Sequence, residues 1–192
     1  MRIVAGTYGG RRLTVPPGRE TRPTSDRVRE ALFSILEARA ARDGGTARTE
    51  GGLSFTAPRV LDLFAGSGAL GLEALSRGAA SAVFVDSARL AVEAVRANLA
   101  ALGLDAPVHR CDAPAALRDA AVRGDAYDLV FLDPPYRPAA GLAAQLREAL
   151  PGVLAPRARV VAESDRRAPL ALGLVVSDER RYGDTLIRIH DT

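Results

Sequence analysis

From Pro58 to about Ser164, the chain alternates short apolar runs with amphipathic stretches of helical spacing. The apolar runs are VLDLF (60–64), AVFVD (82–86), PVHRC (107–111), DLVFLD (128–133) and ARVVAES (158–164). Strands and helices that alternate in this way form a parallel sheet with helices on both faces. The pattern therefore predicts an α/β, Rossmann-like, doubly wound fold, in which ligands bind at the carboxyl ends of the strands.

This rhythm changes after Asp165. The apolar runs LGLVVSDE (172–179) and TLIRIH (185–190) are separated only by RRYGD, which is too short for a crossover helix. We expect these two runs to form an antiparallel hairpin at the end of a mostly parallel sheet. Such an ending is typical of the methyltransferase version of this architecture rather than of a plain dinucleotide-binding domain.

The N-terminal part of the chain, residues 1–41, is strongly basic. Residues 1–29 contain seven arginines and two acidic residues, a net charge of +5, whereas the whole chain carries only +3. The remainder is therefore slightly acidic, and any binding of a polyanion is expected at this end. A solubilising tail is the alternative interpretation.

Within this basic extension, the sequence predicts a small β-hairpin and then a helix. The expected strands are Arg2 to Ala5 and Arg12 to Val15, and Thr24, Ser25 or Asp26 can cap the helix. Helical spacing places Val28, Ala31, Leu32, Ile35 and Leu36 on the docking face, and Arg27, Arg29 and Glu30 toward solvent. The next residues, 42–57, are rich in Gly, Thr and Ser without periodicity, which predicts a flexible connector to a catalytic domain at 58–192.

Length and composition exclude several classes of protein. A chain of 192 residues fits one compact domain with a short appendage. No apolar run approaches the roughly 18 residues of a membrane span, and the start lacks a secretory signal, so we expect a cytoplasmic protein with no membrane partner. The single cysteine, Cys111, cannot form an internal disulfide, and with two histidines it offers no metal site.

The loop DLFAGSGALG (62–71) is the first group of candidate functional residues. Gly66, Gly68 and Gly71 spell GxGxxG where a strand becomes a helix, and Asp86 ends the next strand. Asp86 could bind the ribose of either NAD or S-adenosylmethionine. Asp62 suits the ammonium group of S-adenosylmethionine, whereas it would repel the pyrophosphate of NAD. An NAD-dependent oxidoreductase and a plain strand-to-helix turn are the alternatives.

The second group is Asp133, Pro134, Pro135 and Tyr136, directly after the predicted strand 127–132. An exocyclic amine of a base is a poor nucleophile because its lone pair is delocalised into the ring. Asp133 and the carbonyl of Pro134 can accept the two amine hydrogens, while Pro135 stiffens the loop and Tyr136 offers a ring for stacking. This motif predicts an amino-group methyltransferase, with a strand-terminating turn as the alternative.

Other polar residues carry weaker signals. Asp112 could accept a hydrogen bond from the adenine amino group or cap a helix that begins near Pro114, and both possibilities remain open. Cys111 is typical of a buried filler. His109 and His190 lie on predicted strands without an evident role, and Glu163 could be a salt-bridge partner or an acid at the rim of the site.

The chain resembles the bacterial small-subunit (16S) ribosomal RNA guanine-N2 methyltransferases over nearly its whole length. The resemblance rests on RIVAGTYGGRRL (2–13), RPTSDRVREALFSIL (22–36), DLFAGSGALGLEALSRGA (62–79), DPPY (133–136) and RYGDTLIRI (181–189). The glycine loop and DPPY mark a broad class of amino-group methyltransferases, whereas RPTSDRVREALF is far more specific. The Gly-rich segment at 42–57 departs from the family pattern.

This resemblance implies a class I fold, S-adenosylmethionine as cofactor and a role for several residues. It implies that Asp133, Pro134 and Tyr136 take the target base and that Asp62, Gly66, Gly68, Asp86 and Asp112 bind the cofactor. We add Pro135 to the catalytic set, and Phe64, Ala65 and Ala113 to the cofactor set, as neighbours of these residues. The basic extension would hold RNA through Arg11, Arg12, Arg22, Thr24 and Arg27.

The expected partner is small-subunit ribosomal RNA within an assembling or assembled 30S particle, and we expect a monomer that uses no metal. Other functions stay open at this point. The same motif serves methylation of DNA adenine or of a protein amide. An oxidoreductase would leave DPPY without a role, and a noncatalytic ribosome-assembly factor would explain only the basic extension.

Overall fold

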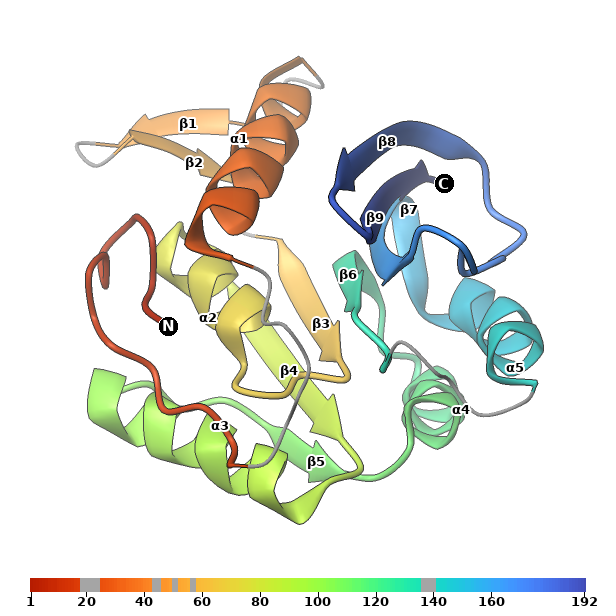
Figure 1. Cartoon of the computed structure of the whole chain (residues 1–192), viewed down its shortest axis with the longest axis horizontal. Coiled ribbons are helices and arrows are strands. Elements are labelled where there is room, and N and C mark those ends of the chain that lie inside the picture. The colour runs from red at the N-terminus through yellow and green to blue at the C-terminus, as the bar shows by residue number, and fades with distance from the viewer. Residues whose placement is uncertain (18–24, 43–45, 50–51, 56–57, 136–140) are drawn as a thin grey trace.

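The computed structural model describes residues 1–17, 25–42, 46–49, 52–55, 58–135 and 141–192, with 46–49 and 52–55 as backbone alone. A seven-stranded sheet in the order β5-β4-β3-β6-β7-β9-β8 crosses the molecule (Figure 1). Its strands are β3 (Arg59–Leu63), β4 (Ser81–Asp86), β5 (Val108–Arg110), β6 (Tyr127–Leu132), β7 (Leu154–Asp165), β8 (Val176–Tyr182) and β9 (Thr185–Asp191). β3 to β7 are parallel, and β9 is antiparallel to both β7 and β8. The predicted parallel sheet with an antiparallel ending is confirmed.

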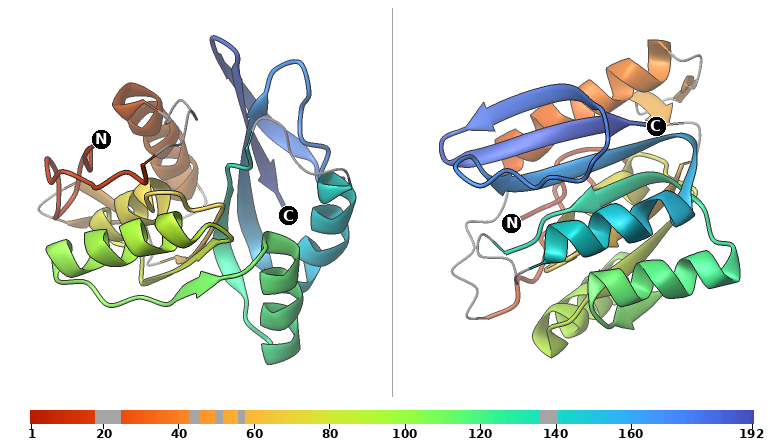
Figure 2. Two further views of the ribbon diagram at one scale, coloured as in Figure 1. Left: turned by 60° about the horizontal axis from the view of Figure 1, so that its bottom comes forward. Right: turned by 90° about the vertical axis from the view of Figure 1, so that its right-hand side faces the viewer.

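Helices cover both faces of this sheet (Figure 2). The first face carries α1 (Asp26–Arg42), α2 (Ala69–Ser76) and α3 (Arg89–Leu102); the second carries α4 (Ala113–Arg123), α5 (Leu142–Ala149) and the 3-10 helix η1 (Leu150–Val153). Alternate strand residues supply the two cores: Val60 and Phe131 pack toward the first face, and Leu61 and Leu132 toward the second. The doubly wound arrangement is therefore as predicted.

The C-terminal hairpin is tighter than its sequence suggested. β8 runs through Arg180, Arg181 and Tyr182, and Tyr182 pairs with Thr185, so the turn is Gly183-Asp184 rather than RRYGD. Gly183 adopts a φ of +65°, as two-residue hairpin turns require. Charged residues fit in β8 because it is an edge strand, where outward side chains reach solvent.

We call residues 1–17 the arm. It forms the predicted hairpin only in part, without regular strands. Arg2 and Arg12 make an isolated antiparallel bridge, and the N–H of Ile3 donates to the carbonyl of Arg11 at 2.9 Å. Ile3 and Leu13 are also buried in the core that α1 and α2 share with the sheet. Pairing within the arm and burial of these two apolar side chains therefore both hold its path.

α1 begins as predicted, because Ser25 Oγ accepts a hydrogen bond from the backbone N–H of Val28 at 3.3 Å. The expectation that Arg29 points to solvent is wrong: its side chain is fully buried. Arg29 donates to the backbone carbonyl of Arg2 and, at 2.9 Å, to Asp26 Oδ1. Helical spacing could not reveal this, because the carbonyl that satisfies Arg29 belongs to the distant arm.

Two short strands, β1 (Thr46–Thr49) and β2 (Gly52–Phe55), lie within the segment predicted as a flexible connector. They pair antiparallel and lie against α1 (Figure 1), so the expectation of an irregular segment is wrong at these residues. Their sequence shows no strand periodicity. Pairing between the two strands and contact with α1 order the backbone here. The division into an extension at 1–41, a connector at 42–57 and a catalytic domain at 58–192 remains a prediction.

α1 also contacts the C-terminal strands. The guanidinium of Arg39 donates to Asp178 at 3.2 Å and to Asp191 at 3.1 Å. The N-terminal helix is therefore linked to β8 and to the end of β9. Among the described helices, none has the length and apolar character of a membrane-spanning helix.

Candidate active site

The loop between β3 and α2 reverses direction within a few residues. Phe64, Gly66 and Gly68 adopt φ angles of +63°, +59° and +77°. Glycine reaches this left-handed region at little cost, whereas Phe64 is held there against its preference. The N–H of Ala65 donates to the carbonyl of Val85 at 3.0 Å, and that of Gly68 to the carbonyl of Ala65 at 2.7 Å. The loop is thus fastened to the end of β4.

Gly71 allows α2 to lie close to the sheet. A Cβ at this position would lie 2.4 Å from Phe84 Cε1 and 3.1 Å from Asp62 Oδ2. The N–H of Gly71 donates to Asp62 Oδ2 at 2.9 Å. The third glycine of the motif therefore serves helix-to-strand packing, the role it has in dinucleotide-binding loops.

Asp86 is buried at the carboxyl end of β4. Its Oδ2 accepts from the N–H of Gly66 at 2.9 Å, and its Oδ1 accepts from the N–H of Ala88 at 2.9 Å. A carboxylate oxygen can accept more than one hydrogen bond, so Asp86 can also accept from the hydroxyls of a ribose. The residue thus fits the predicted contact and, in addition, shapes the glycine loop.

Asp62 is a buried acid beneath the same loop. Burial raises its pKa to about 7, the Gly71 N–H opposes this shift, and the charge of Asp86 adds to it. A cation placed near the carboxyl group would favour its ionised form. The two acceptor carboxylates, Asp62 and Asp86, fit a ligand that carries an ammonium group and a ribose.

The register of the sheet brings the second motif to the first. Leu63 pairs with Val85 on β4 and with Leu132 on β6. The next residues along these three strands, Phe64, Asp86 and Asp133, consequently lie at one level of the sheet edge. Asp133 is half-buried, Pro134 is buried and Pro135 is exposed, while Tyr136 lies outside the described residues.

Glu163 lies at the same level, on the next strand. Ala162 of β7 pairs with Leu132, which places Glu163 in register with Asp133. Glu163 is only 7% exposed. The register therefore places this acid beside the site, and the choice between a salt-bridge partner and an acid at the rim stays a prediction.

Asp112 caps α4. Its Oδ1 accepts from the N–H of Ala115 at 2.8 Å, and the side chain is exposed, while Ala113 is buried. The capping interpretation is confirmed, and a contact of Asp112 with adenine remains a prediction. Burial and the neighbouring Asp112 raise the pKa of the Cys111 thiol, which disfavours a reactive thiolate.

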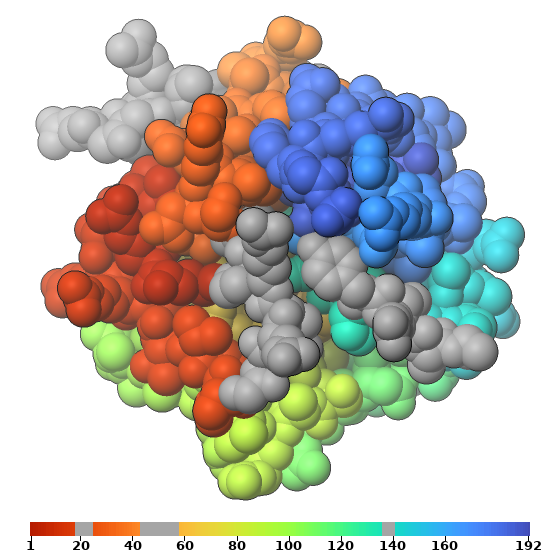
Figure 3. All heavy atoms as spheres, in the orientation of Figure 1, coloured from red at the N-terminus to blue at the C-terminus, as the bar shows by residue number. Residues whose placement is uncertain are grey.

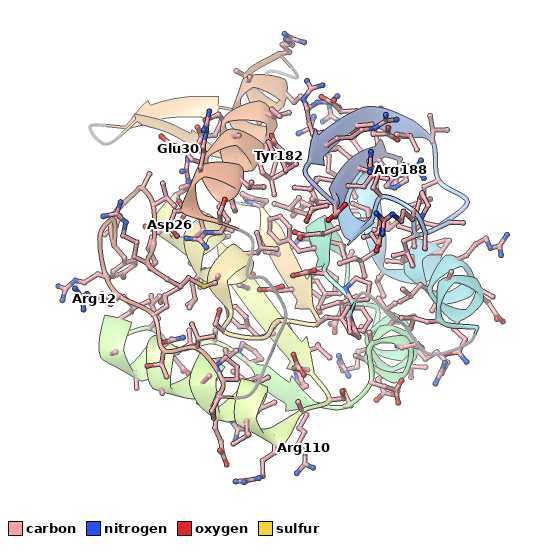
Figure 4. All side chains as sticks on the ribbon, in the orientation of Figure 1. Arg12, Asp26, Glu30, Arg110, Tyr182 and Arg188 are labelled. Carbon is pink, nitrogen blue, oxygen red and sulfur yellow. The ribbon has the colours of Figure 1, made fainter. Side chains whose placement is uncertain are left out.

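The candidate RNA-binding residues Arg11, Arg12 and Arg27 are exposed. Arg12 points away from the body of the molecule (Figure 4). Arg22 and Thr24 lie outside the described residues. Sequence reasoning missed Glu73, Ser76 and Asn98, which hold the arm, because their partners are backbone atoms 68 to 84 residues away.

The sheet order, the antiparallel ending and a glycine loop facing an Asp-Pro-Pro segment define a methyltransferase with the fold of S-adenosylmethionine-dependent methyltransferases. The SAM-dependent methyltransferase from Agrobacterium tumefaciens shares this fold, with a TM-score of 0.63 and 18% identity over 82% of this chain and 61% of that one. The chain belongs to the family described as "Conserved hypothetical protein 95", which matches residues 1–191. The relatives described next are named as methyltransferases, and these names set aside the NAD-dependent oxidoreductase alternative.

Several proteins that are similar to this chain are named as methyltransferases. The chain is 38% identical to "Putative rRNA methyltransferase YlbH" from Bacillus subtilis, over 99% of this chain and 98% of that protein. It is 41% identical to "Ribosomal RNA small subunit methyltransferase D" from Escherichia coli, over 71% of this chain and 61% of that protein. The solved structure "Putative methyltransferase yhhF" from Escherichia coli has a TM-score of 0.78 and 35% identity, over 100% of this chain and 97% of that one.

Proposed function

We propose that this methyltransferase transfers a methyl group from S-adenosylmethionine to the exocyclic N2 amine of a guanine in small-subunit (16S) ribosomal RNA. The observation that carries the proposal is the common level of Phe64, Asp86 and Asp133 at the carboxyl edge of the sheet. It puts an acceptor for an amine beside a loop suited to an adenosyl ligand.

Asp133 and Pro134 act on the amine in this mechanism. The carboxylate of Asp133 accepts one amine hydrogen and the carbonyl of Pro134 accepts the other, which localises the nitrogen lone pair toward the methyl donor. Pro135 has no N–H and restricts the loop. Tyr136 stacks on a flipped or unpaired base. Together these contacts position the amine for attack on the methyl group, and positioning supplies most of the rate.

The cofactor set comprises Asp62 for the ammonium group, Asp86 for the ribose, and the backbone of Phe64, Ala65, Gly66 and Gly68. Asp112 and Ala113 adjoin the adenine in this assignment. S-adenosylmethionine supplies a methyl group already activated by its sulfonium, so the chain needs no nucleophile of its own. Asp133 need not be a strong base, because the amine becomes acidic as it gains the methyl group.

The names of the relatives and the basic arm support a ribosomal RNA substrate. Arg11, Arg12, Arg22, Thr24 and Arg27 are assigned to phosphate contacts. Such contacts add affinity without choosing the base. We assign the substrate to an assembling or assembled 30S particle in the cytoplasm, with a monomeric enzyme and no metal.

The test uses Asp133→Ala, which removes the acceptor, in a methyl-transfer assay on small-subunit particles from a strain that lacks the gene. We expect turnover to fall at least a hundredfold, while affinity for S-adenosylmethionine stays within about twofold, because Asp133 contacts the amine and not the adenosyl group. Mass mapping of the RNA identifies the modified nucleotide. Near-normal turnover of Asp133→Ala would contradict the mechanism.

Two further outcomes separate the alternatives. Methylation of DNA adenine or of a protein, but not of the particles, would show that the assigned substrate is wrong and that the assigned methyl transfer to an amine is right. Full cellular function of Asp133→Ala would favour a noncatalytic assembly factor. A thermal shift with S-adenosylmethionine and none with NAD is expected, because a ligand selective for the folded state stabilises it by mass action.

A further inference from the structure

The arm is fastened along the helix that begins at the glycine loop. The buried carboxylate of Glu73 on α2 accepts from the N–H groups of Val4 at 2.7 Å and Ala5 at 3.0 Å. Ser76 Oγ, one turn further, donates to the carbonyl of Ala5 at 2.5 Å and accepts from the N–H of Tyr8 at 2.9 Å. Figure 1 shows the arm passing along α2 and α3.

One side chain joins the arm to the glycine loop itself. Asn98 of α3 is 2% exposed. Its Oδ1 accepts from the N–H of Thr14 at 2.7 Å, and its Nδ2 donates both to the carbonyl of Thr14 and to the carbonyl of Ser67, each at 2.9 Å. Ser67 lies between Gly66 and Gly68, within the loop assigned to the cofactor. A second link joins the same residue to the arm, because Ser67 Oγ donates to Met1 Sδ at 3.2 Å.

We infer that Asn98 is a positioning residue that couples docking of the arm to the shape of the cofactor loop, so that the arm helps to set the affinity for S-adenosylmethionine. An asparagine side chain has one oxygen acceptor and two N–H donors. Here the oxygen and one donor hold Thr14, and the remaining donor holds Ser67. The amide cannot rotate to improve one set of bonds without breaking the other.

Separation of the arm would remove the Thr14 partners of the oxygen and of one N–H of this amide, and water would take their place. The amide would then no longer be held in the one orientation in which its other N–H donates to the carbonyl of Ser67. The loop would then lose an anchor at the centre of its glycine turn. The docked arm consequently stabilises the loop in the conformation assigned to cofactor binding.

Coupling of this kind is reciprocal. If the docked arm strengthens cofactor binding, bound cofactor strengthens docking of the arm by the same factor. The inference rests on the proposed function in assigning RNA to the arm and S-adenosylmethionine to the loop. Under these two assignments, RNA that contacts the docked arm binds more tightly to the enzyme with bound cofactor than to the enzyme without it.

The principal test compares wild type with Asn98→Leu, which keeps the side-chain size and removes all three hydrogen bonds. We expect about tenfold weaker binding of S-adenosylmethionine by calorimetry, a similar rise in its KM, and a kcat within about twofold of wild type at saturating cofactor. S-adenosylhomocysteine should strengthen binding of small-subunit particles to wild type severalfold, and to Asn98→Leu hardly at all.

Ser76→Ala is the matched control. It removes two buried arm contacts and leaves Thr14, Asn98 and Ser67 bonded, so its cofactor affinity should stay within about twofold of wild type. Unchanged cofactor affinity in Asn98→Leu would overturn the inference. So would equal losses in both variants, or a loss of kcat with the cofactor effect on particle binding preserved, because these results indicate a merely structural role.

Hydrogen exchange on the unmutated protein gives a second measurement that no folding defect can affect. S-adenosylmethionine should slow exchange of the backbone N–H groups of Val4, Ala5 and Thr14 severalfold, although none of them lies in the assigned cofactor site. Unchanged exchange of these groups, with protection confined to the loop, would overturn the coupling. Failure of wild type to bind S-adenosylmethionine at all would instead refute the proposed function.

Discussion

At the scale of single residues, the carboxyl group of Asp62 has an altered acidity. Desolvation and the nearby Asp86 raise its pKa to about 7, well above that of an unfolded aspartic acid. The folded chain therefore binds a proton that the unfolded chain releases between about pH 4 and 7. The stability that Asp62 contributes is fully present below about pH 4 and is lost as the pH rises to about 7.

The first prediction concerns this window. The free energy of unfolding of wild type, relative to that of Asp62→Asn, should fall by a few kcal/mol between pH 4 and 7 and then level off. Chemical denaturation at several pH values measures it, and the difference between the two proteins cancels the other carboxylates. A difference that is flat with pH would show that Asp62 is ionised well below pH 7.

The same acid predicts a pH dependence of cofactor binding. An ammonium group beside Asp62 favours the ionised carboxylate, so binding below pH 7 should release a proton, and affinity should rise up to tenfold per pH unit toward pH 7. Calorimetry in two buffers of different ionisation enthalpy counts that proton. Asp62→Asn should bind more weakly and lose the proton release; equal release in both proteins would assign it to another group.

At the scale of elements, the sequence left two roles open for Asp112, a cap of α4 and a contact with the adenine amino group, and the structure shows the cap. Asp112→Ala should destabilise the fold by about 0.5–2 kcal/mol, because the N–H of Ala115 loses its acceptor. Asp112→Ser should restore most of this stability, since serine is also a good N-cap. Thermal or chemical denaturation measures both changes.

Cofactor affinity then tests the adenine contact. If Asp112 also accepts from the adenine amino group, Asp112→Ser should still bind S-adenosylmethionine several times more weakly than wild type despite its restored stability. Wild-type affinity in Asp112→Ser would leave helix capping as the role of the residue.

At the scale of the whole molecule, the arm, α1 and the C-terminal strands share one face of the protein (Figure 3). The exposed Arg11 and Arg12 are proposed to contact RNA phosphates. Replacing both by Ala should weaken binding to small-subunit particles and flatten its salt dependence by roughly 0.7 to 0.9 log units per lost contact. The methylated position should not change, because phosphate contacts do not read the base.

A control with the same loss of charge is Arg110→Ala combined with Arg118→Ala. Both side chains are exposed, and Arg110 lies far from Arg12 (Figure 4). This variant should keep the salt dependence of wild type. Parallel salt titrations with equal affinity for the Arg11 and Arg12 variant would mean that the arm is only a solvated surface.

The sequence by itself determined the parallel sheet, its antiparallel ending and the two motifs of the site. These features follow from local rules: apolar periodicity, crossover length, glycines at a strand-to-helix turn, and proline after a strand. The sequence also predicts the juxtaposition of Asp86 and Asp133, because the carboxyl ends of parallel strands meet at one edge of the sheet.

Only the tertiary structure decided how the basic N-terminal segment is held. The burial of Arg29, the docking of the arm on Glu73 and Ser76, and the three bonds of Asn98 all join residues far apart in the chain. The partners are mostly backbone N–H and carbonyl groups, which every residue carries, so the sequence contains no pattern that marks them. The raised pKa of Asp62 depends likewise on burial of its carboxyl group, which exists only after folding.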